Sequence, residues 1–309
     1  DFAWAPVIVN ALRDRVEKEI FGYCAPMTPF YSAVCGWQKR RFDWDVKPEW
    51  ITFVPSVVAS INIAIRSFTN EGDGVIIQQP VYDPFATIVK NDNRKVVNNG
   101  LVHINNEFKM NLEELEALAA KPENKLMVLC SPHNPVGRVW TKEELTAVAE
   151  ICLKHDVLLV TDEIHADIVY EGYKHYPLLS LDKRYEENFI LLTAPSKTFN
   201  VAGLKASMSI IPNKELREKF EHTQKAMSLD VRNTFGLECV SAAYTDEGEE
   251  WMKQEIAYMQ KNVDFLEKFV EEQMPGTKMI RPQGTFLCWL DLSELHLGDQ
   301  ELFQRVVFE

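Results

Sequence analysis

A chain of 309 residues with 46% hydrophobic and 26% charged side chains has room for about two domains, which excludes collagen-like, disordered and low-complexity proteins. Acidic residues outnumber basic residues 46 to 33, and the formal net charge of −13 argues against a nucleic-acid partner. The apolar runs fall short of the ~20 residues that a membrane-spanning helix needs, so no membrane partner is expected.

Helices are predicted in the N-terminal part of the chain. The segment from Pro6 to Ile20 has a proline in its first turn, and the segment from Pro29 to Phe42 carries apolar residues at helical spacing. A third helix is expected to begin at Ser56, because apolar residues form one stripe over the following twelve positions.

Short apolar runs then alternate with helical patterns. The runs cover residues 74–79, 125–130, 157–161 and 189–193. A capping box, Thr141-Lys-Glu-Glu144, opens an amphipathic helix that is expected to end near His155. Strands alternating with helices favour an α/β fold with a mostly parallel sheet that is flanked by helices on both faces.

One long helix is predicted from about Glu247 to the Pro-Gly pair at 275–276, and residues 278–292 beyond it have a strand-like pattern. This change in the sequence pattern predicts two domains: a large cofactor-binding domain over 22–249 and a smaller α+β domain over 250–309. Residues 1–21 could add to the smaller domain.

The ends of the sequence are unusual. The chain begins at Asp1 without a methionine, and the helical pattern at its other end is still running at Glu309. We therefore expect the smaller domain to be incomplete, with further C-terminal residues absent from the sequence. The six cysteines form no Cys-x-x-Cys pair, so a reduced, cytoplasmic location is expected rather than a disulfide framework or a zinc knuckle.

Three polar segments follow strands of the predicted sheet. They are Ser131-Pro-His-Asn-Pro-Val-Gly137, Asp162-Glu-Ile-His165 and Ala194-Pro-Ser-Lys-Thr-Phe-Asn200. Because the carboxyl ends of parallel strands meet at one edge of a sheet, we expect the three segments to converge.

The side chains of these segments suit pyridoxal phosphate. Lys197, just past a buried strand, is suited to lose its proton and attack a carbonyl carbon. Asp162 could hold a ring nitrogen protonated so that the ring accepts electrons, and Asn134 could donate to a ring oxygen. A metal site is the weaker interpretation, because Asp162 and Glu163 should point in different directions along a strand.

The three motifs resemble the signature set of fold-type I pyridoxal-phosphate enzymes, the aspartate aminotransferase superfamily. The residues of these motifs are most similar to those of its cystathionine β-lyase/C–S lyase branch. The resemblance extends from Asp1-Phe2 to Gly284-Thr-Phe-Leu287. It implies an aspartate aminotransferase-like fold, with pyridoxal 5'-phosphate as the cofactor.

The resemblance also implies roles for residues at the cofactor ring. Lys197 would bind the cofactor covalently and Asp162 would face the pyridine nitrogen. Asn134 would bond the phenolic oxygen, near which His165 stands at a position often held by a tyrosine. Tyr82 would stack on the ring and would join Lys197 and Asp162 as a catalytic residue.

Further roles follow for the cofactor phosphate. Backbone N–H groups of Val57 and Val58 would hold it at a helix start, where the helix dipole favours an anion, and Ser56 could add a hydroxyl. Ser196 and Lys205 would complete this phosphate site.

The resemblance implies a homodimer with shared active sites, because Tyr23 resembles a tyrosine that reaches the phosphate of the neighbouring subunit. The family's carboxylate-binding arginine would lie beyond Glu309, so no residue of this sequence is assigned that role. The implied function is a carbon–sulfur β-lyase acting on cystathionine or S-substituted cysteines. An aminotransferase is the alternative, and a cofactor-loaded regulator acting by protein contact is an alternative of another class.

Overall fold

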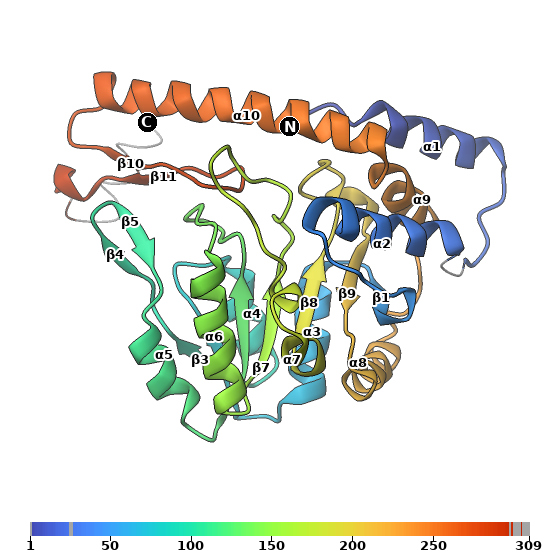
Figure 1. Cartoon of the computed structure of the whole chain (residues 1–309), viewed down its shortest axis with the longest axis horizontal. Helices are drawn as coiled ribbons and strands as arrows, with labels where there is room; N and C mark the ends of the chain where they lie inside the picture. The colour runs from blue at the N-terminus through green and yellow to red at the C-terminus, as the bar shows by residue number, and fades with distance from the viewer. Residues whose placement is uncertain (1, 25–26, 297, 299–303, 305–309) are drawn as a thin grey trace.

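The computed structural model describes residues 2–24, 27–296, 298 and 304. The helical pattern predicted up to Glu309 therefore lies outside the described residues. Within them, one large sheet, covered by helices on both faces, lies below a long helix that crosses the top of the molecule (Figure 1). No helix in this part of the chain is long and apolar enough to cross a membrane.

The central sheet has seven strands in the order β1-β9-β8-β7-β6-β2-β3. Strands β3, β2, β6, β7 and β8 pair in parallel, whereas β9 pairs antiparallel with both β8 and β1. The strands are β1 (Ile51–Val54), β2 (Gly74–Ile77), β3 (Lys95–Asn98), β6 (Asn124–Cys130), β7 (Leu158–Asp162), β8 (Ile190–Thr193) and β9 (Ser207–Ile210).

Ten α-helices are present in the described residues. They are α1 (Pro6–Glu17), α2 (Thr28–Phe42), α3 (Val57–Phe68), α4 (Pro84–Asn91), α5 (Leu112–Ala119), α6 (Lys142–Lys154), α7 (Lys183–Asn188), α8 (Lys214–Ala226), α9 (Thr234–Ala243) and α10 (Asp246–Gln273). Short 3-10 helices cover Pro48–Trp50, Leu178–Ser180, Ala202–Leu204 and Ser293–Leu295.

Side-chain alternation along the strands divides the core into two layers. On β6, Met127 and Leu129 pack with helices α2, α5, α6 and α9, whereas Leu126 and Val128 pack with α3, α4 and α8 on the other face. Successive side chains of a strand point to opposite faces, so a strand with apolar residues throughout has to be covered on both sides. The predicted α/β fold with a mostly parallel sheet is confirmed.

Two smaller antiparallel hairpins stand beside the sheet. One pairs β4 (Val102–Ile104) with β5 (Glu107–Lys109), and the other pairs β10 (Lys278–Ile280) with β11 (Trp289–Asp291). The strand-like pattern over 278–292 is therefore two short strands, because Pro282 and Gly284 interrupt it. The division into domains over 22–249 and 250–309 stays a prediction.

Candidate active site

A cavity of about 340 Å³ lies at the carboxyl edge of strands β6, β7 and β8. All three motif segments contribute to its wall, as their position after parallel strands predicts. The lining residues are Pro55, Ser56, Val57, Val58, Tyr82, Cys130, Asn134, Asp162, Ile164, His165, Ala194, Ser196, Lys197, Ala202, Lys205, Ala206 and Ser207.

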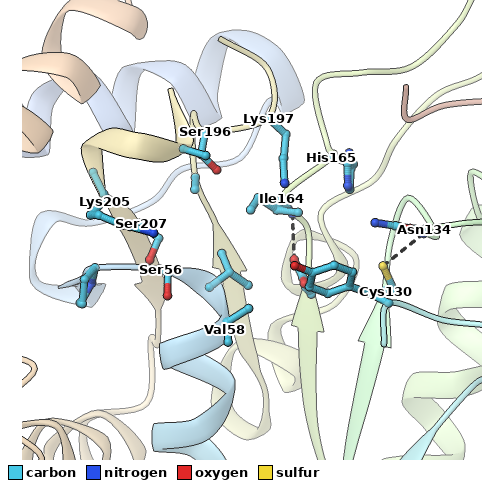
Figure 2. Close-up of a pocket in the computed structure, with 17 residues that line it drawn as sticks. Ser56, Val58, Cys130, Asn134, Ile164, His165, Ser196, Lys197, Lys205 and Ser207 are labelled. Carbon is cyan, nitrogen blue, oxygen red and sulfur yellow. Dashed lines mark hydrogen bonds between the residues drawn. The ribbon is translucent and has the colours of Figure 1, made fainter. Parts of the chain in front are cut away.

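Figure 2 shows that polar groups gather at two ends of this cavity. Ser56, Ser196, Lys205 and Ser207 lie at one end, and Asn134 and His165 lie at the other (Figure 2). The amine of Lys197 extends between them. Ten of the eleven residues that the sequence singles out line this one cavity.

The start of helix α3 forms the first end of the cavity. Ser56 is its N-cap, and the Ser56 hydroxyl accepts a hydrogen bond of 3.1 Å from the backbone N–H of Ala59. The N–H groups of a helix's first turn have no partner inside the helix, so those of Val57 and Val58 can bind an anion. Lys205, which also lines this end, adds a cation.

The Asn134 segment is anchored to strand β6. The Asn134 backbone N–H donates to Cys130 Sγ at 3.4 Å, and Trp140 Nε1 donates to the Cys130 carbonyl at 2.9 Å. His133 Nε2 lies 2.9 Å from the carbonyl oxygen of Pro80, in the segment that carries Tyr82. Burial lowers the pKa of His133 to about 4, so this neutral histidine ties two walls of the cavity together.

Asp162 ends strand β7 as a buried carboxyl group. Its Oδ1 accepts from the Ile164 backbone N–H at 3.1 Å. Burial raises the pKa of Asp162 to about 7, although this hydrogen bond and the charge of Lys197 oppose the rise. A cationic group bound beside Asp162 would therefore be stabilised by it and would lower this pKa again.

His165 and Lys197 both lie close to the Phe286 ring. The ring centroids of His165 and Phe286 are 5.2 Å apart, and Lys197 Nζ lies 5.8 Å from the Phe286 centroid. Burial, and then the charge of Lys197, lowers the pKa of His165 to about 3. His165 is therefore neutral at physiological pH, and its buried Nδ1 has no partner among the described residues.

Glu163 points away from the cavity that Asp162 lines. Its carboxylate contacts His175 Nε2 at 2.7 Å and accepts from Thr161 Oγ1 at 3.1 Å. Alternation along β7 thus sends neighbouring acidic side chains in different directions, as the sequence predicts.

Tyr23 does not line the cavity and is fully exposed in the described part of the chain. Its expected role involves a second subunit and stays a prediction. Seven further residues line the cavity although the sequence does not single them out. Two of these are Ile164, which lies within a recognised motif, and Ser207, whose hydroxyl donates to the Val54 carbonyl at 2.8 Å. The hydroxyl of Ser207, two positions after Lys205, was an available signal.

Comparison with known proteins identifies the family. The model of the family described as aminotransferase class I and II matches residues 9–309. The chain is 40% identical over 307 residues to cystathionine beta-lyase PatB of Bacillus subtilis (strain 168), covering 99% of this chain and 79% of that protein. It is 32% identical over 309 residues to protein MalY of Escherichia coli (strain K12), covering 99% and 78%.

A solved structure is similar over the whole chain. The crystal structure of cystalysin from Treponema denticola, which contains a pyridoxal 5'-phosphate cofactor, matches with a TM-score of 0.96 and 35% identity, covering 100% of this chain and 78% of that chain. The resemblance predicted from the three motifs is confirmed. The chain belongs to the class I and II aminotransferase family and, as a fold-type I pyridoxal-phosphate enzyme, to its C–S lyase branch.

Proposed function

We propose that the protein is a pyridoxal-phosphate-dependent carbon–sulfur β-lyase that acts on cystathionine or other S-substituted cysteines. The observation that carries this proposal is the meeting of Lys197, Asp162 and Asn134 around one cavity at the sheet edge. The B. subtilis relative, at 40% identity, is a cystathionine beta-lyase, which favours a lyase over an aminotransferase. The reaction consumes one water molecule and releases a thiol, pyruvate and ammonia.

The residues at one end of the cavity fit the cofactor ring. Asp162 is a buried carboxyl group that a protonated ring nitrogen would pair with, and such a pair would offset the cost of its burial. Asn134 and the Nδ1 atom of His165, which has no partner among the residues that the structure describes, supply polar atoms for the ring oxygen. Tyr82 also lines the cavity and offers an aromatic face for stacking.

The other end fits the cofactor phosphate. The first turn of α3 presents the N–H groups of Val57 and Val58, while the hydroxyl of the N-cap residue Ser56 accepts a hydrogen bond from the Ala59 N–H. Ser196 and Lys205 line this end as well. This group of donors supplies positive potential locally in a chain whose net charge is −13.

Different residues of this chain carry out different steps of the reaction. Bound pyridoxal phosphate would supply an aldehyde for the substrate's amine and a ring that accepts electrons. Asp162 would hold the proton on the ring nitrogen. Lys197 Nζ takes the substrate's α-proton, the bond between Cβ and sulfur breaks, and the leaving thiolate takes up a proton. The remaining enamine is hydrolysed to pyruvate and ammonia.

A direct assay tests the proposal. Holoenzyme is incubated with cystathionine, and pyruvate and free thiol are measured with and without an added 2-oxo acid. We expect equal yields of pyruvate and thiol without the oxo acid. Turnover that strictly needs the oxo acid and gives no pyruvate would instead identify an aminotransferase. Lys197→Ala should abolish both turnover and the visible absorbance of the bound cofactor.

We also infer that the protein acts as a homodimer with shared active sites. Tyr23 and its neighbour Phe21 are exposed aromatic residues in the segment that follows α1. Their exposure supports a protein contact at this segment, because large exposed apolar groups mark interaction surfaces. Sedimentation should give the mass of two chains, and a monomer that is fully active would contradict this inference.

A further inference from the structure

A second cavity of about 320 Å³ adjoins the candidate active site. Both cavities are lined by Ser196, Lys197 and Ala202, so the Lys197 segment forms a wall common to the two. The first cavity accounts for the residues expected to hold the cofactor. The second cavity has no role in the function proposed above, although Lys197 forms part of its wall.

Most of the second cavity is apolar. Ile168 and Met259 are buried side chains of its wall, and Phe2 and Phe286 add aromatic surface. Asn200, which also lines the cavity, already donates its side-chain amide to the Phe2 carbonyl at 3.0 Å. Walls of this kind accommodate the methylene groups and the sulfur of a thioether chain.

One acidic side chain interrupts this apolar lining. Glu255 of helix α10 is 7% exposed, and its Oε2 atom is buried without a hydrogen-bond partner among the residues described. A buried carboxyl group without a partner is unfavourable, and burial raises the pKa of Glu255 to about 7. Lys197 is the other ionisable side chain of the lining. The cavity thus has an unmatched acceptor for a cation.

We propose that the second cavity binds the leaving-group side of the substrate and that Glu255 selects thioethers ending in an ammonium group. The inference rests on the proposed lyase function and names its substrate class. An amine that removes the α-proton must lie beside Cα, and the sulfur is only two bonds further along the substrate. The substituent of the sulfur can then enter the neighbouring cavity, with its methylene groups on the apolar wall and its cation at Glu255.

Two substrates of equal size test the charge preference. S-(2-aminoethyl)-L-cysteine and S-propyl-L-cysteine have the same number of non-hydrogen atoms, but only the first ends in an ammonium. With the holoenzyme, we expect kcat/KM for pyruvate release to be at least about tenfold higher for the aminoethyl substrate. Glu255→Gln should remove this preference by lowering kcat/KM for the aminoethyl substrate and leave the propyl value within about twofold.

The pH dependence gives a signature that a structural role would not produce. Glu255 becomes charged as the pH rises through about 7, whereas the substrate ammonium stays protonated. The ratio of the two kcat/KM values should therefore rise between about pH 6 and 8 in the unchanged protein and stay flat in Glu255→Gln. Titration of Asp162 or His165 affects both substrates, so it cancels in the ratio.

A binding measurement separates this inference from the lyase function. L-lysine and L-2-aminoheptanoate are carbon analogues of the two substrates without a leaving group, and calorimetry gives their dissociation constants for the holoenzyme. We expect the unchanged protein to bind lysine more tightly than 2-aminoheptanoate. Glu255→Gln should lose this difference, whereas Glu271→Gln, a control at an exposed position of the same helix, should keep it. Failure of both thioethers to yield pyruvate would overturn the lyase function but leave this measurement decisive. Equal binding of both analogues by the unchanged protein, or equal weakening of both by Glu255→Gln, would overturn the role of Glu255.

Discussion

Asp162 is a buried carboxyl group whose pKa is raised to about 7 by its burial. In an unfolded chain an aspartate loses its proton near pH 4, so between about pH 4 and 7 the folded protein binds a proton that the unfolded chain has lost. The contribution of Asp162 to the free energy of unfolding therefore falls as the pH rises through this window. A cation bound at Asp162 would reverse that loss.

Asp162→Asn should separate the stability and catalytic effects of this carboxyl group. In the cofactor-free protein, the free energy of unfolding should fall less steeply between about pH 4 and 7, because the amide does not titrate. In the holoenzyme, kcat/KM should fall at least about a hundredfold, since an amide cannot hold the ring proton by charge. Denaturant unfolding at several pH values and the pyruvate assay measure the two effects.

Asp14→Asn is a matched control, because Asp14 is an exposed carboxyl group on α1. It should change neither the pH dependence of unfolding nor kcat/KM. A steeper pH dependence in Asp162→Asn than in the unchanged protein would contradict the raised pKa. Retention of full activity would contradict the role of Asp162 at the ring nitrogen.

At the scale of elements, the Asn134 turn is clamped by the segment between β10 and β11. The carbonyl of Gly137 accepts from the backbone N–H of Gln283 at 2.8 Å and of Gly284 at 3.1 Å. Gly137 has a φ of +73°, and a Cβ there would lie 2.7 Å from Pro282 Cβ. Glycine is needed at this position for its backbone conformation and for this close approach.

Gly137→Ala should therefore disturb both stability and the cofactor site. We expect the free energy of unfolding to fall by about 1–3 kcal/mol and the affinity for pyridoxal phosphate to fall several-fold, because the turn that carries Asn134 must shift. Gly172→Ala is the matched control: Gly172 has a φ of +89°, but a Cβ added there would have no neighbouring atom within 4 Å. An equal loss of cofactor affinity in both variants would show that backbone strain alone is responsible.

The sequence predicts the elements that carry the motifs better than those that complete the sheet. Strands β6, β7 and β8 are continuous apolar runs followed by polar motifs, and the capping box at Thr141 and Glu144 is present with both hydrogen bonds. Strand β9 was missed because Ser207 and Ser209 alternate with Met208 and Ile210, although both serines are buried. Buried hydroxyls bonded to neighbouring backbone or hydroxyl groups have no apolar signature.

The sequence likewise predicts the first cavity better than the second. Residues of the first cavity follow strands in recognisable motifs, so their convergence follows from the topology of a parallel sheet. Glu255 lies within the amphipathic pattern of α10, beside Met252 and Met259, and a glutamate there is expected at the solvent. Its burial depends on the packing of α10 against distant segments, which periodicity along one helix does not encode.

At the scale of the whole molecule, the shared active site can be tested by mixing two variants that each have low activity. We expect each site of the dimer to combine Lys197 of one chain with Tyr23 of the other. A mixed dimer of one Lys197→Ala chain and one Tyr23→Ala chain then has one site with both substitutions and one site with neither. Tyr23→Ala alone should lower cofactor affinity and activity, because the phosphate loses a contact. After subunit exchange in an equal mixture, about a quarter of the activity of the unchanged protein should return.

A mixture of Lys197→Ala with Asp162→Asn controls for effects of mixing itself. Both of these side chains line the same cavity of one chain, so every site in a mixed dimer keeps one altered residue and no activity should return. Subunit exchange is verified by native mass spectrometry of chains with different tags. If mixed dimers form and the Tyr23 mixture stays inactive, Tyr23 acts within its own chain, and the exposed segment after α1 requires another role.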